Sequence, residues 1–313
     1  MSGLLTVFKK ELADFFTSWR FIILFILVLL VGVAAIYEAA GSIRGAVTGE
    51  SRFVFIALFT TSGRTQFSFL WFVAFFIPIV GIALGFDAIN SEKNNGTLSR
   101  LLSQPIYRDA VINAKFLAGV VTIAVMITTV VLLVAGLGLR MIGLPPTSEE
   151  AIRLFFFLIV SVIYGAFWLG LAILFSIFLR RIATSALASI AIWIFFFFFM
   201  SIIAGVVANS VAPAGETLDS QIRNVQVQLT AMRVSPVMLF QESMAVLLVP
   251  ASRTLGQILQ LQAGGGAFML PGPLSLGQSL LMVWPHLVTI ILLTVVCFAV
   301  SYIKFMREEI RAT

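Results

Sequence analysis

Residues 87–115 read DAINSEKNNGTLSRLLSQPIYRDAVINAK, and this polar stretch decides the fold because of what flanks it. It lies between two runs, 67–86 and 116–139, that contain no charged residue. Each run is long enough to cross the roughly 30 Å hydrocarbon core of a bilayer as a helix. The polar stretch is therefore expected in water, at one face of a membrane.

The same stretch has the pattern of a helix that binds a partner. Its apolar residues recur at helical spacing: Leu98, Leu101, Leu102 and Ile106. Arg100 and Arg108 add positive charge beside them. Such an amphipathic helix at a membrane surface can bury its leucines against another protein. Alternatively, the leucines rest on the membrane or on the cytoplasmic ends of the protein's own helices.

The composition is that of an integral membrane protein. Hydrophobic residues make up 60% of the 313 residues and charged residues 11%, whereas a soluble domain carries about 25% charged residues. Long continuous apolar runs indicate helices, because the strands of a membrane barrel alternate. Six runs lack Asp, Glu, Lys and Arg: 21–37, 67–86, 116–139, 154–179, 183–208 and 284–303. We therefore expect an all-α membrane protein with six transmembrane helices, forming a single domain over 1–313.

The distribution of basic residues predicts the orientation. Cytoplasmic segments of membrane proteins are enriched in Lys and Arg. The side that holds both termini, the 87–115 loop and the Arg180-Arg181 turn carries twelve of the 20 Lys and Arg residues. Both termini are predicted to be cytoplasmic, in the cell (plasma) membrane of a prokaryote. Topology accounts for the +6 net charge, so no nucleic-acid partner is expected.

The segments outside the spans add three expectations. Residues 1–20 are amphipathic and predict a helix in the membrane interface, either as a topology anchor or as a lever that touches a cytoplasmic partner. The first span begins only after these residues, and no small-residue cleavage site follows closely, so it is a retained anchor. Pro145-Pro146 interrupts helix in the link 140–153. Residues 180–182 predict a tight antiparallel hairpin between spans four and five.

Residues 209–283 predict a small helical extracytoplasmic cap between spans five and six. Apolar residues at helical spacing over 218–232 indicate one amphipathic helix, which Ser235-Pro236 ends. Residues 237–249 indicate a second helix, which Pro250 closes, and a Gly- and Pro-rich turn region follows. The cap is too small and too apolar for an independent domain, so we expect it to pack on the outer mouth of the bundle.

The sequence lacks the motifs of several chemistries. It contains no G-x-x-x-x-G-K-[ST] and no H-E-x-x-H, and its single histidine, His286, and single cysteine, Cys297, do not make a usual zinc site. We expect no catalytic residue, cofactor or metal in this chain. A membrane-embedded enzyme is disfavoured because the spans hold no acidic pair or Ser–His set. The spans also lack the ionisable residues that ion-coupled transporters commonly bury. Energy for uphill transport would then come from a cytoplasmic motor.

Three segments of the polar stretch carry a family resemblance. These are DAINSE at 87–92, GTL at 96–98 and LLSQPIYR at 101–108. Together they resemble the pattern E-x-x-x-G-T-L…L-L-S-x-P-x-x-R found between spans two and three in permease subunits of type-2 ABC exporters. Lys115 matches a lysine that often follows. The six spans, the amphipathic N-terminus and the large segment before span six extend the resemblance over the whole chain.

The resemblance implies a non-catalytic half-transporter. Two permeases, identical or related, would pair with two ABC ATP-binding subunits, which would hold ATP and Mg²⁺. The helix near 96–105 would sit in a cleft of the ATPase, with the Arg180-Arg181 turn as a smaller contact. Gly96 would permit a tight entry, Thr97 would cap the helix and Pro105 would end it. The expected ATPase-coupling residues are Glu92, Gly96, Thr97, Leu98, Leu101, Leu102, Pro105, Arg108, Arg180 and Arg181.

Two functions follow from these patterns. The first is ATP-driven export of an apolar or amphiphilic substrate by alternating access, with membrane lipids around the spans. The alternative is an ATP-independent channel or lipid scramblase. The Phe-rich runs at 155–157 and 195–199 suit both, and they also suit simple packing against lipid and other helices.

Overall fold

The computed structural model describes residues 2–46, 53–61, 68–97, 106–215, 217–250 and 274–307. This part of the chain is all-helical and contains six helices long and apolar enough to cross a membrane, which confirms the predicted fold class. The six candidate spans are Trp19–Ile43, Phe69–Asn94, Arg108–Ile142, Ser148–Phe178, Ile182–Val211 and Leu276–Arg307. Each contains one predicted apolar run nearly whole and is longer than it, because polar residues at the ends continue the helix.

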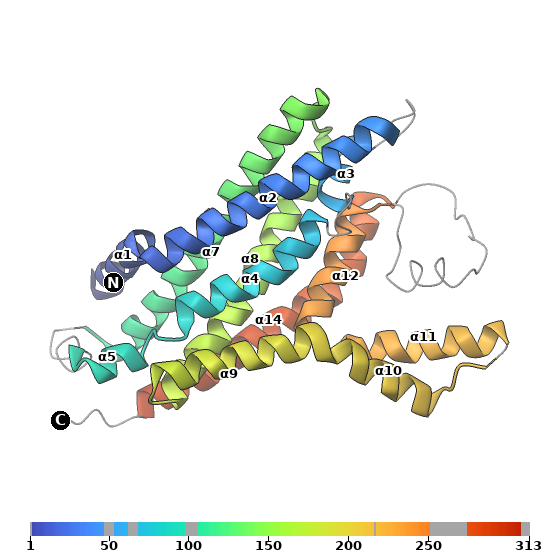
Figure 1. Ribbon diagram of the computed structural model, residues 1–313. Coiled ribbons are helices and arrows are strands. Elements are labelled where there is room, and N and C mark those ends of the chain that lie inside the picture. The colour runs from blue at the N-terminus through green and yellow to red at the C-terminus, as the bar shows by residue number, and fades with distance from the viewer. Residues whose placement is uncertain are drawn as a thin grey trace.

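The helices form one tilted bundle with a set of shorter helices around it (Figure 1). In chain order they are α1 (Ser2–Thr17), α2 (Trp19–Ala46), α3 (Val54–Thr60), α4 (Phe69–Gly85), α5 (Asn90–Asn94), α7 (Arg108–Ile142), α8 (Ser148–Phe178), α9 (Ile182–Ile194), the π-helix η1 (Phe195–Phe199), α10 (Met200–Val211), α11 (Leu218–Met232), α12 (Pro236–Leu248) and α14 (Leu276–Arg307). Helices α1 and α5 and the C-terminal part of α14 lie at the same end of the bundle, here called the termini end. Helix α3 lies toward the opposite, far end.

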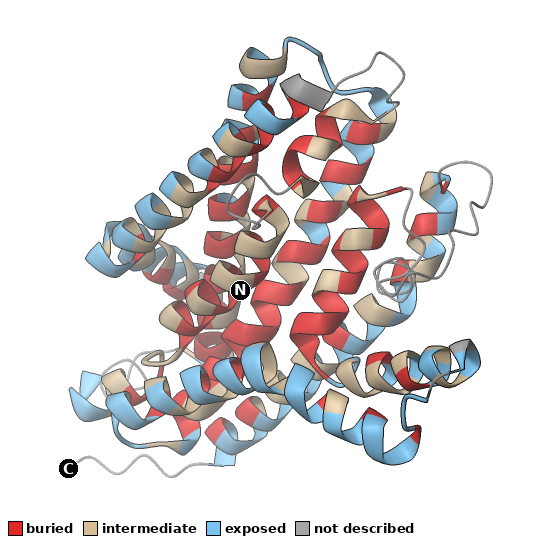
Figure 2. Cartoon of the chain, turned by 45° about the vertical axis from the view of Figure 1, so that its right-hand side comes forward, coloured by how far each residue is buried: buried red, intermediate tan, exposed pale blue. Residues whose placement is uncertain are grey.

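Helices α4 and α8 form the centre of the bundle. In the most apolar stretch of each span, 67% of the α8 residues are buried, but only 17% in span five and 11% in span six. Figure 2 shows the buried residues gathered on the inner helices and the exposed ones along the outer helices. Spans five and six therefore present most of their apolar surface outward, to lipid or to another membrane protein.

Small residues allow α4 and α8 to approach closely. A Cβ atom at Gly81 would lie 2.9 Å from the carbonyl oxygen of Gly165. A Cβ atom at Gly85 would lie 2.8 Å from the Cβ of Ala172 and 2.9 Å from the carbonyl oxygen of Leu169. Lipid is as apolar as these side chains, so close packing of this kind is a main source of helix association in membranes.

The turns between spans follow local sequence signals. Gly143, with φ of +77°, ends α7 in the left-handed conformation. Thr147 begins α8 with a capping box that Glu150 completes, so the break predicted at Pro145-Pro146 is confirmed. The turn at residues 179–181 is as tight as expected. Beyond it, however, α9 diverges from α8 and does not pack along it as an antiparallel hairpin (Figure 1).

A buried carboxylate at the far end holds α3, a helix that sequence patterns did not indicate. Glu150 is 2% exposed, and one of its oxygens accepts hydrogen bonds from the backbone N–H groups of Phe55 (3.0 Å) and Ile56 (3.2 Å). These are N–H groups in the first turn of α3, which lack partners inside the helix. The charge of Glu150 is also favourable at a helix N-terminus. Glu150 thus fixes a short apolar helix against α8.

Arg153, one turn further along α8, is fully buried and closes the far end. Its guanidinium donates to the carbonyl oxygens of Leu247 (2.8 Å) and Leu274 (2.7 Å) and to the hydroxyl of Ser279 (3.1 Å). Glu149 supplies the countercharge at 2.8 Å. One side chain therefore joins α8 to the end of α12 and the start of α14.

The segment predicted as an outer cap lies deeper than expected. Helices α11 and α12 occur where the apolar patterns indicate them. However, α12 packs against α14, α8 and α4, and eleven of its 13 residues are buried. It is therefore a part of the bundle and does not only cover its mouth, because its apolar side chains find partners on three spans. The Gly- and Pro-rich region predicted at 264–273 lies outside the described residues.

Replacing Gly85 by Val tests the close packing of the two central helices. The added side chain has no room against Ala172 and the α8 backbone, so we expect a loss of roughly 1–3 kcal/mol of stability, typical of overpacking. The measurement is the thermal unfolding midpoint in detergent. The matched control is Gly136→Val in α7, because no atom lies within 4 Å of a Cβ built there. Equal midpoints for the two variants would contradict this account of the core.

Candidate coupling site

Three elements meet at one buried lysine at the termini end. Lys115, near the start of α7, has a side chain only 5% exposed. Its Nζ lies 2.9 Å from a carboxylate oxygen of Glu11 in α1 and 2.8 Å from a carboxylate oxygen of Glu92 in α5. We call Glu11, Glu92 and Lys115 the ion triad. It joins the N-terminal helix, the start of the 87–115 loop and the third span.

The electrostatics around Glu11 favour its charged form. Burial alone raises the pKa of the Glu11 carboxyl, but the adjacent Lys115 ammonium and then Lys10 outweigh it, and the pKa lies below its usual value. Lys10 bridges Glu11 (3.0 Å) and the exposed Asp14 (3.1 Å). A buried charge that loses its partner costs several kcal/mol. The three elements are therefore held together strongly.

Helix α1 packs on α7 by a face that includes a charge. Val7 and Glu11 are both buried, and their spacing of four residues places them on one side of the helix. Near the start of α1, a Cβ built at Gly3 would lie 3.4 Å from the side chain of Ile106, just before α7. The N-terminal helix thus spans the distance from the end of the loop to the ion triad.

The start of the loop is fixed to the α8–α9 turn by a second set of contacts. The hydroxyl of Ser176 accepts hydrogen bonds from the backbone N–H groups of Ile89 (2.9 Å) and Asn90 (3.1 Å), at the N-terminus of α5. The side chain of Asn94 donates to the carbonyl oxygen of Arg180 at 3.2 Å. The two regions predicted to contact an ATPase, the loop and the Arg180-Arg181 turn, therefore lie side by side.

An ion pair also connects the first span to the loop. Arg20, at the start of α2, pairs with Asp87 through hydrogen-bonded contact, and its guanidinium lies 5.4 Å from the centre of the Phe86 ring. Arg20 is largely exposed, so this pair alone contributes little energy. It adds a third connection between the loop and a separate element.

The described coupling residues occupy distinct positions around the loop. Gly96 has φ of +67° and open space around it, so glycine is favoured there by backbone conformation alone, as a tight entry requires. The Thr97 hydroxyl donates back to the carbonyl oxygen of Glu92 at 3.3 Å. Arg180 and Arg181 lie in the turn before α9, and Arg108 begins α7. Leu98, Leu101, Leu102 and Pro105 lie outside the described residues.

Glu92, one of the predicted ATPase-coupling residues, is largely withdrawn from the surface. Its side chain is 14% exposed and its carboxylate lies 2.8 Å from Nζ of Lys115. Any role of Glu92 in coupling therefore acts through the position of the loop. Sequence reasoning missed Glu11 altogether and noted Lys115 only as a family match. One signal was available: Glu11 follows Val7 by four residues in a mainly apolar amphipathic helix, so a carboxylate shares a face with an apolar residue.

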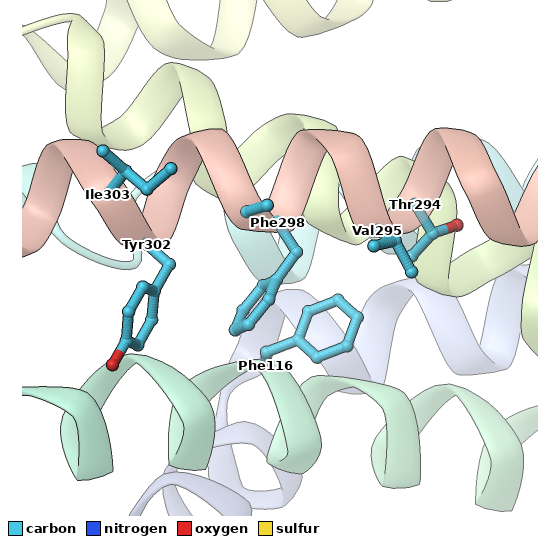
Figure 3. A pocket seen from close by; sticks show the side chains of 7 residues that line it. Phe116, Thr294, Val295, Phe298, Tyr302 and Ile303 are labelled. Carbon is cyan, nitrogen blue, oxygen red and sulfur yellow. The ribbon is translucent and has the colours of Figure 1, made fainter.

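An apolar cavity of about 250 Å³ lies between α7 and α14 in the described structure (Figure 3). Phe116 and Phe298 meet across it, with ring centres 4.6 Å apart. Its lining residues are Phe116, Thr294, Val295, Phe298, Ala299, Tyr302 and Ile303.

Comparisons with known proteins identify the family of the chain. The model of the family described as "ABC-2 family transporter protein" matches residues 5–310, and the chain belongs to this family. A relative from Pseudomonas aeruginosa PAO1, named "Probable ABC transporter permease protein NosY", is 29% identical over 196 residues. The alignment covers 60% of this chain and 64% of the relative, so it spans slightly less than two thirds of that protein. The chain is thus a multi-pass membrane protein of the ABC-2 transporter family.

Replacing Lys115 by Met tests the ion triad. The change keeps the length of the side chain but leaves two carboxylates without their shared cation, so we expect a loss of about 3–5 kcal/mol. The measurements are thermal stability in detergent and the rate of proteolysis within α1, which should rise. Lys9→Met is the matched control, because Lys9 is an exposed lysine of α1 outside the triad. A Lys115→Met protein as stable as the control would refute a structural role for the triad.

The triad also predicts a loss of stability in acid. The folded-state pKa of Glu11 is depressed, so its contribution is present above its unfolded pKa of 4.5 and is lost as the pH falls through the lower folded-state value. The stability difference between the wild type and Glu11→Gln should therefore be constant near neutral pH and shrink below about pH 4.5. Unfolding midpoints measured from pH 7 to pH 3 give this difference. Asp14→Asn, at an exposed position, should show no comparable trend. A difference that grows in acid would contradict the assignment.

Proposed function

We propose that this chain is the non-catalytic permease of an ATP-driven exporter, and that a separate ATPase binds the loop at 87–115. The observation that carries the proposal is the attachment of this loop to four other elements. Lys115 joins it to α1 and α7, Ser176 joins it to α8, and Arg20 joins it to α2. A loop so attached can transmit force, whereas a free connector would absorb it. ATP and Mg²⁺ would be held by the partner, and this chain would need no cofactor.

The proposed motion starts at the leucine-bearing part of the loop. Closure of the ATPase dimer around ATP would displace Leu98, Leu101 and Leu102, and α5 would carry the displacement into α4. The triad would make α1 and the start of α7 follow. Because α4 packs tightly on α8 through Gly81 and Gly85, the central helices would move together. This gives the spans two arrangements, open toward one side of the membrane or the other.

A second permease, identical or related, completes the proposed transporter. Spans five and six expose most of their apolar surface, including Leu187, Phe198 and Ile202 on span five. An exposed apolar face inside a bilayer is free to contact either lipid or a second permease. We propose that span five contributes to the contact between permeases and that lipids cover the remaining surface, with both termini in the cytoplasm.

An apolar or amphiphilic substrate suits the interior of this bundle. Trp71 and Phe75 of α4 pack with Trp193 of α9 and Phe197 of η1, with ring centres 5.0–5.8 Å apart. Aromatic rings offer a wide contact area at low conformational cost. The six spans carry few charged side chains between their ends. We propose that the substrate leaves the cytoplasm along such aromatic surfaces.

The double substitution Leu101→Asp, Leu102→Asp tests the docking loop. Two carboxylates in an apolar interface would each remain unpaired, so binding of the ATPase should weaken by at least about 100-fold. The measurements are co-purification with the partner ATPase and ATP turnover by the complex in liposomes. Asn95→Asp is the control, because it adds a carboxylate at an exposed position of the same loop outside the leucine set.

Two outcomes would overturn the proposal. Complex formation and coupled ATP turnover that both survive the double substitution would exclude docking through these leucines. Substrate movement across the membrane of liposomes that contain the wild-type permease and no ATPase would favour the channel or scramblase alternative.

A further inference from the structure

A buried carboxylate on α12 connects two helices that flank it in the sequence. Glu242 is 2% exposed. The guanidinium of Arg233, at the end of α11, binds both of its oxygens, at 2.6 and 2.9 Å. The imidazole Nε2 of His286, in α14, lies 2.9 Å from one of them. Glu242 therefore holds the α11–α12 turn against the sixth span.

The same turn is attached to the fifth span at its irregular segment. The Ser235 hydroxyl, between Arg233 and α12, donates to the carbonyl oxygen of Phe196 at 3.3 Å. Phe196 lies in η1, where five residues form a π-helix within the otherwise α-helical span. Such π-turns bend helices and occur frequently at functional sites. The α11–α12 turn is thus a bridge from the bend of span five to span six.

The cluster is not needed to bury α12. Phe240 stacks on Tyr164 of α8 with ring centres 4.2 Å apart, and Tyr164 donates to the carbonyl oxygen of Ala74 in α4 at 3.3 Å. These contacts already fix α12 to the central helices. Taking Glu242 out of water is costly, and replacing a whole buried ion pair by apolar residues is often neutral or stabilising in proteins. The charged cluster therefore needs an explanation other than packing.

The strength of the interaction between His286 and Glu242 depends on how many protons the imidazole ring carries. Its Nε2 faces the Glu242 carboxylate, and its Nδ1 lies 3.3 Å from the carbonyl oxygen of Met282. Both neighbours are acceptors, so only the doubly protonated ring donates to both at once. The neutral ring donates to one of them and carries no charge. In the described structure the Glu242 carboxylate contacts this ring, and Arg233 binds the same carboxylate. Burial raises the pKa of Glu242, but hydrogen bonds from His286 and Arg233 outweigh it and lower the pKa, so Glu242 is charged near neutral pH.

We propose that Glu242 is a positioning residue, a joint through which spans five and six move together, and that a proton on His286 tightens this joint. The joint lies far from the coupling site: His286 precedes Arg307, at the termini end of α14, by roughly 30 Å of helix. It would pass a movement of the bent span five to α14 during transport. The inference rests on the proposed transport function but concerns a different part of the molecule.

Distances between spin labels test the joint in the complete complex with its ATPase. One label pair replaces Arg223 of α11 and Leu281 of α14, both exposed, in a Cys297→Ser background. In the wild type we expect a narrow distance distribution with and without ATP, narrower at pH 6 than at pH 8. Glu242→Gln should broaden it at least twofold at both pH values. His286→Gln keeps a donor for Glu242 but cannot titrate, so it should remove the pH dependence.

Controls separate the joint from folding and from docking. Asp219→Asn changes an exposed carboxylate on α11 and should leave the distribution unchanged. A second label pair at the termini end, Ala183 and Met306, both exposed, should be insensitive to Glu242→Gln, whereas general unfolding would broaden both pairs. Should Glu242→Gln fail to fold, His286→Gln and Ser235→Ala carry the test alone. An unchanged α11–α14 distribution, or pH dependence that persists in His286→Gln, overturns the joint. If the wild-type protein did not bind an ATPase, the proposed function would be overturned instead.

Discussion

The structure depends first on the way in which one buried ammonium group is neutralised. Lys115 cannot remain charged in an apolar environment without partners, and its two carboxylates come from positions 11 and 92 of the chain. If either carboxylate were removed, the ammonium group and the remaining carboxylate would be buried without full charge compensation. This requirement converts an N-terminal helix and a surface loop into extensions of the bundle. It gives the start of the loop, as far as Glu92, a fixed position relative to the spans, which a chain of polar residues alone would not have.

The far end of the bundle uses the same principle with a different charge. Arg153 is fully buried and its donors reach Leu247 and Leu274, which flank a segment outside the described residues. Between these two polar ends the spans associate through small residues and aromatic contacts. Burial of apolar surface drives helix association weakly inside a bilayer, because lipid is an equally good solvent for it. Close packing and the polar anchors at both ends therefore set the arrangement of the helices.

Local signals predicted much of the fold, and partners distant in sequence account for what they missed. The six spans and the break at Pro145-Pro146 follow from apolar run length and from residue-specific backbone preferences. The short helix α3 was missed because its first N–H groups are satisfied by Glu150, some 95 residues away. The contact of α1 with α7 was not predicted, for a related reason. Periodicity identifies an amphipathic helix but does not distinguish lipid from α7 as the surface it covers.

The distribution of burial indicates how such a transporter can move. Helices α4, α7 and α8 share close contacts and have the greatest buried fractions, so bending them separately would sacrifice packing along their whole length. Span six packs extensively on α8, whereas span five contacts this core along a narrower surface and contains a π-turn where its hydrogen bonding is already irregular. We infer that movement enters at the loop beside the rigid core and is expressed most at span five. Helix α12 contacts the core, span six and the π-turn of span five, so it is one element through which these parts constrain each other.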